Sequence, residues 1–147
     1  MGYKIDLVPA RVQAGYVNRH SLYRRKADSW TVTDVSRHIA LVRGSGRTEE
    51  IRLAKVWRSL NQLEFPSLAL ELAVLQATKG RRLGAVADNF WEVLRYLSVE
   101  SFLTTRLVDP SNTANIVSDD LTIGEKAAVV EAARRARNQL RWDAIIW

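Results

Sequence analysis

The stretch that decides the fold is IRLAKVWRSLNQLEFPSLALEL, residues 51–72. Its first part carries apolar residues at helical spacing, which predicts a helix with one buried face. These residues are Leu53, Ala54, Trp57, Leu60 and Leu63. Phe65, Pro66 and Ser67 then end this helix and start another, because proline suits the first turn of a helix. The second helix, residues 68–77, is apolar nearly all round, which is typical of a central helix packed on several sides.

A further helix is expected on each side of this pair. The one before it can be capped by Thr33 or Asp34 and ends at the Gly-Ser-Gly sequence of residues 44–46. The one after it runs from about residue 84 to residue 107 and is stopped by the Asp-Pro pair at residues 109–110.

The last helix begins at Thr122, where Thr122 and Glu125 have the spacing of a capping box. It continues through an alanine-rich stripe to basic residues ending at Arg141. The adjacent acids Asp119 and Asp120 precede it and are interpreted as partners of the positive end of its dipole.

The first 33 residues are expected to be extended rather than helical. Residues 4–10 alternate in polarity and are ended by a proline, which predicts a short strand. Further extended segments are expected around residues 15–17 and 30–32, with a polar loop at 24–29. The fold class is therefore mainly α within α+β: short N-terminal strands over residues 1–33 and a five-helix bundle over residues 34–147.

Composition limits the classes of protein. A chain of 147 residues with 47% apolar residues is long enough for one domain with a real core. It has no run of 18 apolar residues and no cysteine, so neither a membrane-spanning helix nor a disulfide or thiolate site is expected. No secretory signal is recognised, and the simplest location is the cytoplasm. The net charge of +6 favours polyanionic partners, although basic helices are also common as plain solvated surface.

Three stretches, in this order, carry a resemblance to a family. Residues 5–10, IDLVPA, resemble the strand that delivers the third catalytic carboxylate of CD-NTase-type nucleotidyltransferases. Residues 51–57 with 65–72 resemble the two helices that hold the donor triphosphate, and residues 109–117 resemble the turn before the final helix. The chain therefore resembles the C-terminal part of the oligoadenylate-synthase-like and cyclic-GMP-AMP-synthase-like enzymes of the DNA polymerase beta-like superfamily. The first 33 residues would then be the edge of the palm, and the rest the helical lobe.

The resemblance implies a site with three named residues. These enzymes transfer a nucleotidyl group from a nucleoside triphosphate (NTP) with Mg²⁺, which needs carboxylate ligands. Asp6 would be the metal-binding catalytic acid, while Lys55 and Ser67 would hold the donor phosphates. The alternatives are an outward-facing Asp6 on an edge strand, a solvated Lys55 and an ordinary helix-start Ser67. Leu68 stands where relatives often have an aromatic residue, so base stacking there is not implied.

The family's other two acids, an Asp-x-Asp or Glu-x-Asp pair after a Gly-Ser helix start, have no match here. The Gly-Ser-Gly sequence at residues 44–46 lies between two helices, and Asp119 and Asp120 would point to opposite faces of a strand. With one acid, a two-metal site cannot be assembled from this chain. The expectation is a part that is inactive without the missing half, which a separate chain would supply. The alternative is a non-catalytic helical module that binds a protein partner or nucleic acid, for example a regulator of a defence system. Self-association is a further option, because a missing half would leave apolar surface open.

Nucleic acid is kept as a possible partner because basic residues form three clusters. They lie at residues 19–26, at 79–82 and at 134–141, and the only aromatics noted near the first cluster are Tyr16 and Tyr23. Zinc is not expected, since His20 and His38 are the only histidines and lie on separate predicted elements.

Overall fold

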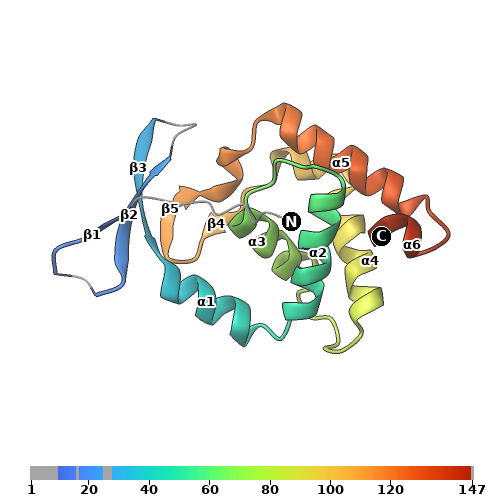
Figure 1. Ribbon diagram of the computed structural model, residues 1–147, viewed down its shortest axis with the longest axis horizontal. Helices are drawn as coiled ribbons and strands as arrows, with labels where there is room; N and C mark the ends of the chain where they lie inside the picture. Colours follow the sequence, from blue (N-terminus) through green and yellow to red (C-terminus); the bar gives the residue numbers. More distant parts are fainter. Residues whose placement is uncertain (1–9, 16, 25–27, 147) are drawn as a thin grey trace, which may run out of the picture.

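The computed structural model describes residues 10–15, 17–24 and 28–146. A small antiparallel sheet comes first, with strand order β1-β2-β3, and projects from one end of the helical part (Figure 1). Its strands are β1 (Ala10–Val12), β2 (Arg19–Arg24) and β3 (Ser29–Asp34). The strand expected around residues 15–17 is wrong: Gly15 lies in a turn with a φ of +84°, and the strand follows later. The predicted strand at residues 4–10 lies outside the described residues except for Ala10, which begins β1.

The helices follow in the predicted order and form the mainly α part of an α+β fold. They are α1 (Val35–Gly44), α2 (Thr48–Leu60), α3 (Ser67–Ala77), α4 (Val86–Leu97), α5 (Ile123–Arg137) and the short α6 (Asp143–Ile146). Helices α2 to α5 surround one core that includes Trp57, Leu70, Phe90, Leu94 and Val129, all fully buried. Helix α3 is the central helix that its composition predicts, and it lies among its neighbours in Figure 1. No helix of the described residues is long and apolar enough to cross a membrane.

Local capping signals account for two of the helix starts. Asp34 is the N-cap of α1, and its carboxylate accepts a 3.0 Å hydrogen bond from the Arg37 amide. Thr122 and Glu125 form the predicted capping box of α5. The α3 start differs slightly, because Pro66 is the N-cap and Ser67 the first helical residue.

Helix lengths and one core residue differ from expectation. Helix α4 ends at Leu97, where the Ser98 hydroxyl donates to the Arg95 carbonyl at 2.8 Å and Val99 turns extended. A 3₁₀ turn, η1 (Glu100–Thr104), follows and keeps Phe102 buried, so the apolar spacing continued although the α-helix did not. Leu60 is 50% exposed and is not a core residue, because it belongs to the last turn of α2.

The segment predicted as a turn contains a β-hairpin. Its strands are β4 (Val108–Asp109) and β5 (Asn112–Ile116), followed by a 3₁₀ turn, η2 (Val117–Asp120). The hairpin lies between the sheet and the helices in Figure 1, and the Asn112 amide donates to the Val32 carbonyl at 3.1 Å. It therefore joins the N-terminal sheet to the helical part.

A buried polar network fixes the loop between α3 and α4. Arg47 pairs with Glu50 at 3.2 Å and donates to the carbonyls of Thr78, Arg81 and Arg82. Asn89 donates to Glu50 at 2.8 Å and also to the Arg82 carbonyl at 2.9 Å. Because nearly all of these groups are shielded from water, each needs its partners, and the loop is held at several points.

Candidate functional site

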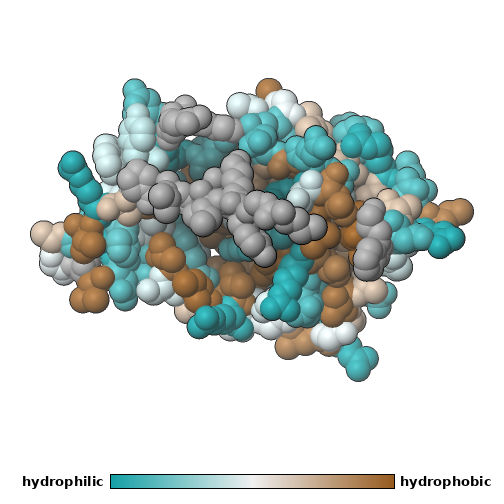
Figure 2. Space-filling model, viewed as in Figure 1, coloured by the Kyte–Doolittle hydropathy of each residue, from teal (hydrophilic) through white to brown (hydrophobic). Residues whose placement is uncertain are grey.

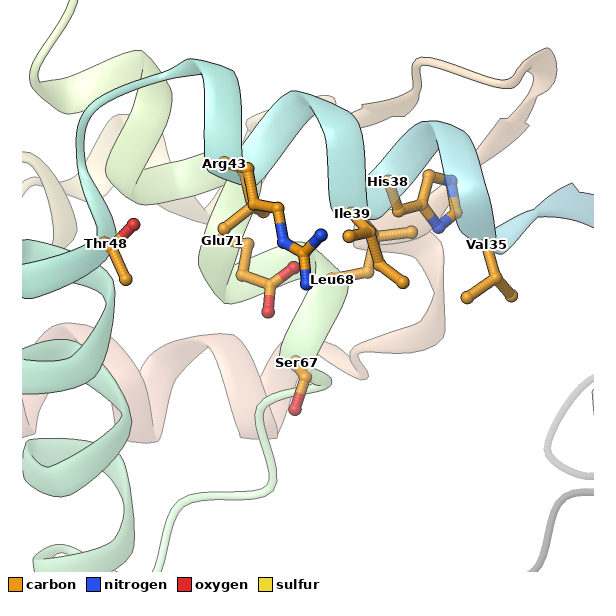
Figure 3. Close-up of a pocket in the computed structure, with 9 residues that line it drawn as sticks. Val35, His38, Ile39, Arg43, Thr48, Ser67, Leu68 and Glu71 are labelled. Atoms are coloured by element: carbon orange, nitrogen blue, oxygen red, sulfur yellow. The ribbon is translucent and has the colours of Figure 1, made fainter.

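A cavity of about 460 Å³ lies between α1 and the N-terminal ends of α2 and α3 (Figure 3). Its walls are mainly aliphatic, from Val35, Ile39 and Val42 of α1 and Leu68 of α3. Its polar lining residues are His38, Arg43, Thr48, Ser67 and Glu71. Apolar walls with a few convergent polar groups are the usual make-up of a small-molecule site.

Lys55 lies next to this cavity rather than in its lining. Its ammonium pairs with Glu71 of α3, with 2.6 Å between Nζ and Oε1. The Lys55 side chain is 39% exposed, so the pair is accessible to an incoming anion. The sequence missed Glu71 as a partner, although it follows Ser67 by four residues and therefore shares its side of α3.

Ser67 begins α3 at the edge of the cavity. Its hydroxyl accepts a 3.1 Å hydrogen bond from Arg58 of α2, which also donates to the Phe65 carbonyl at 2.7 Å. The first backbone N–H groups of α3 have no partner within the helix, as at any helix start. A hydroxyl, a guanidinium and a helix N-terminus thus meet at one point, which favours an anion.

The structure brings the two predicted phosphate-binding residues to one surface. We define the α2–α3 polar cluster as Lys55, Arg58, Ser67 and Glu71. Lys55 and Arg58 are three residues apart on α2, and both contact side chains of α3. The cluster has two cations and one anion, so a phosphate would compete with Glu71 for Lys55.

Arg43 adds a third cation from the opposite wall. It lies in the last turn of α1, and Figure 3 shows its side chain extending from α1 into the space beside Glu71. Within the described part of the chain it forms no ion pair. Sequence reasoning had no signal for Arg43, because only the tertiary fold brings α1 over α3.

Asp6 lies outside the described residues, so the structure does not place it. Among residues 10–15, 17–24 and 28–146, no group of three histidine or acidic side chains has the arrangement of a metal site. The described residues alone therefore do not fit a Mg²⁺ ion. Asp119 and Asp120 do not serve this purpose either, since Asp120 accepts a 2.9 Å hydrogen bond from Arg24.

A buried carboxylate lies behind the cavity wall. Asp109 is fully buried, and its Oδ1 accepts a 2.8 Å hydrogen bond from His38 Nε2 and two 2.7 Å hydrogen bonds from Ser111. Burial alone would raise the pKa of Asp109, but hydrogen bonds from Ser111, His38 and Asn115 outweigh it and lower that pKa below its ordinary value. Asp109 is thus an ionised anchor for His38.

The Ser111-His38-Asp109 set is not a nucleophile triad. Ser111 and Asp109 both lie against the same imidazole nitrogen, at 3.2 Å and 2.8 Å. A triad needs the two ring nitrogens to serve the two partners separately. The set joins α1 to the β4–β5 hairpin and is structural.

Comparison with known proteins identifies the fold. No protein-family model and no curated protein sequence matches the chain. Among solved structures, CdnC of E. coli MS115-1 with ATP matches with a TM-score of 0.69 and 22% identity, over 89% of this chain and 51% of that one. CdnC of the same strain in its complex with HORMA-deltaN matches with a TM-score of 0.71 and 19% identity, over 86% of this chain and 49% of that one. The chain thus spans about half the length of CdnC and has the fold of a CD-NTase-like nucleotidyltransferase fragment.

Proposed function

We propose that this chain is the C-terminal part of a CD-NTase-type nucleotidyltransferase and that it supplies the site for the donor triphosphate. The observation that carries the proposal is the α2–α3 polar cluster beside the cavity: Lys55 and Ser67 come from different helices, yet both reach one accessible surface. The ATP named with the matching CdnC structure supports an NTP as the ligand.

The cavity and the cluster divide the work of binding a nucleotide. The aliphatic walls from α1 and α3 suit the base and sugar, which gain free energy when apolar surface leaves water. Lys55 is a compact charge for the β- and γ-phosphate oxygens, and Ser67 offers its hydroxyl with the α3 N-terminus. Arg43 and Arg58 raise the positive potential around both.

Catalysis needs groups beyond the described residues. Mg²⁺ in such enzymes neutralises the phosphates and clamps the attacking and leaving oxygens. Asp6 is proposed as one of its ligands, and the other acids would come from the half of the fold that this chain lacks. The chain by itself would then bind nucleotide but not transfer it, and the second half would come from a separate chain.

The test is a titration of ATP and of GTP, with Mg²⁺, against the wild type, Lys55→Ala and Asp6→Asn. We expect Lys55→Ala to weaken binding about 5- to 20-fold, as the loss of one charge-assisted contact does. Arg52→Ala is the matched control, because Arg52 lies on the same helix and pairs only locally with Glu49 at 2.8 Å. Equal, negligible binding by all variants and the wild type would rule out the donor site.

A second candidate is a non-catalytic module of the same fold, for instance a regulator in antiviral defence. Helix α1 favours it: no residue of α1 is buried, and Val35 and Ile39 are each 46% exposed. A protein partner could cover that surface, and one matching CdnC structure is a complex with HORMA-deltaN. The neighbouring coding sequence separates the two proposals: an adjacent frame with Gly-Ser and Asp-x-Asp favours the enzyme part, and an intact nucleotidyltransferase elsewhere in the operon favours the module.

A further inference from the structure

The sheet presents two aromatic rings side by side. In the β2–β3 register Tyr23 lies directly opposite Trp30, so both project from the same face. Their ring centroids are 5.5 Å apart and the rings are tilted by 56°. Trp30 is 55% exposed and Tyr23 39%, which is a high exposure for neighbouring large rings.

Arginines flank these rings. The β1–β2 register places Arg11 opposite Ser21, on the face that also carries Tyr23. The Arg11 guanidinium carbon is 5.6 Å from the centre of the Trp30 ring, a cation–π contact. Arg19, at the other end of β2, belongs to the same face. We define the aromatic face as Arg11, Arg19, Tyr23 and Trp30.

The opposite face of the sheet is the one engaged with the rest of the molecule. It carries Thr33, which is buried, and Arg24, which donates to Asp120 of η2 and to Asn115 of β5. Side chains alternate between the two faces of a strand, so the aromatic face points away from the helical part. At the sheet end of the molecule, Figure 2 shows hydrophobic residues beside strongly hydrophilic ones rather than one apolar patch.

We propose that the aromatic face binds single-stranded nucleic acid. Unpaired bases would stack on Trp30 and Tyr23, and Arg11 and Arg19 would contact the adjacent phosphates. Charge complementarity supports this occupant, because the chain carries a net charge of +6. The sequence of the β2–β3 turn adds Arg25 and Lys26, whose placement lies outside the described residues.

The composition of the face favours nucleic acid over a buried polypeptide. Val32 is the one aliphatic side chain among its described residues, whereas a face that packs into a protein core is rich in aliphatic residues. Two acids, Asp28 and Asp34, lie close by, but Asp28 accepts a hydrogen bond from the Tyr23 hydroxyl and Asp34 caps α1. Both carboxylates are thus engaged within the protein.

The experiment measures binding of fluorescein-labelled oligo(dT) and oligo(U) of about 12 nucleotides by fluorescence anisotropy. We expect Trp30→Ala to weaken binding about 5- to 100-fold and Trp30→Phe to retain most of it, since phenylalanine keeps a stacking face. Arg11→Ala should weaken binding and reduce the steepness of its salt dependence by about one phosphate contact. Because Trp30 is largely exposed, its replacement leaves the core intact, and circular dichroism checks this.

Two control variants separate this surface from the donor site. Arg52→Ala removes an exposed charge on α2 and should leave oligonucleotide affinity unchanged, and so should Lys55→Ala. Equal affinity of folded Trp30→Ala and wild type would overturn the proposal, as would equal binding of a duplex of the same length. Trp30-dependent self-association in sedimentation, without oligonucleotide binding, would instead assign the face to a protein contact and would equally overturn it.

Discussion

His38 of α1 and Asp109 of β4 are joined by a 2.8 Å hydrogen bond between Nε2 and Oδ1, across 71 residues of sequence. The cavity-lining helix is thereby fixed to the hairpin through a carboxylate that has no contact with water. The proposed nucleotide site thus depends on a residue outside the α2–α3 polar cluster.

The first prediction concerns the pH dependence of stability. The pKa of Asp109 in the folded protein lies below its ordinary value of 3.8, so the folded state favours the ionised form. The stabilisation is fully present above the unfolded pKa and is lost as pH falls through the folded pKa. Urea unfolding of the wild type and Asp109→Asn, from pH about 7 down to about 2, should show a difference of about 3 kcal/mol that shrinks in acid.

The control for this titration is Asp119→Asn, which changes an exposed carboxylate near the same hairpin. It should leave the pH profile of the wild type unchanged. A constant difference between the wild type and Asp109→Asn at all pH values would show that ionisation of Asp109 does not contribute.

The second prediction compares two adjacent glutamates. Glu50→Ala leaves Arg47 buried without its carboxylate and removes the acceptor of Asn89, so the free energy of unfolding should fall by about 3–5 kcal/mol. Glu49→Ala breaks an exposed pair with Arg52 and should cost less than about 1 kcal/mol. Chemical denaturation of both variants measures the contrast, and similar losses would contradict the role given to the buried network.

The third prediction rests on the proposed function and concerns Glu71. Its carboxylate lies 2.6 Å from the Lys55 ammonium and competes with a phosphate for that charge. Glu71→Gln should therefore strengthen ATP binding by about 2- to 5-fold, whereas Lys55→Ala weakens it. Calorimetric titration of the two variants checks the opposite signs; weaker binding by folded Glu71→Gln would count against phosphate at Lys55.

The fourth prediction concerns the capping box of α5. Thr122→Ala removes the hydroxyl that accepts from the Glu125 amide at 3.2 Å and should lower the free energy of unfolding by about 1 kcal/mol. Thr48→Ala is the control, since Thr48 begins α2 without being its N-cap. Thermal unfolding of both variants decides whether the cap contributes; an equal change in both would deny it.

The parts of the fold that sequence predicted are those with local causes. Asp34 and Thr122 act on backbone groups within the next three residues, so their capping roles can be recognised without the fold. The apolar composition of α3 likewise indicated its central place, because a helix with no polar face must be covered on several sides.

The parts that were missed depend on distant pairing. The β4–β5 hairpin consists of short strands rich in polar residues, and Asp109 and Asn115 are stabilised by each other and by His38. The partner of Lys55 is similarly non-local, since Glu71 approaches it only after α2 and α3 pack together. Lys55 and Ser67 could be proposed from the sequence, whereas Arg43 and Arg58 required the fold.

The network around Arg47 has a consequence for proteolysis. The loop between α3 and α4 contains Lys79, Arg81 and Arg82, three cleavage points for trypsin in an exposed segment. A protease must draw its substrate into an extended conformation, yet Arg47 and Asn89 hold the carbonyls of Arg81 and Arg82. Cutting there requires the buried Arg47–Glu50 pair to open first, so the rate of nicking at this loop should follow the unfolding equilibrium of the helical core.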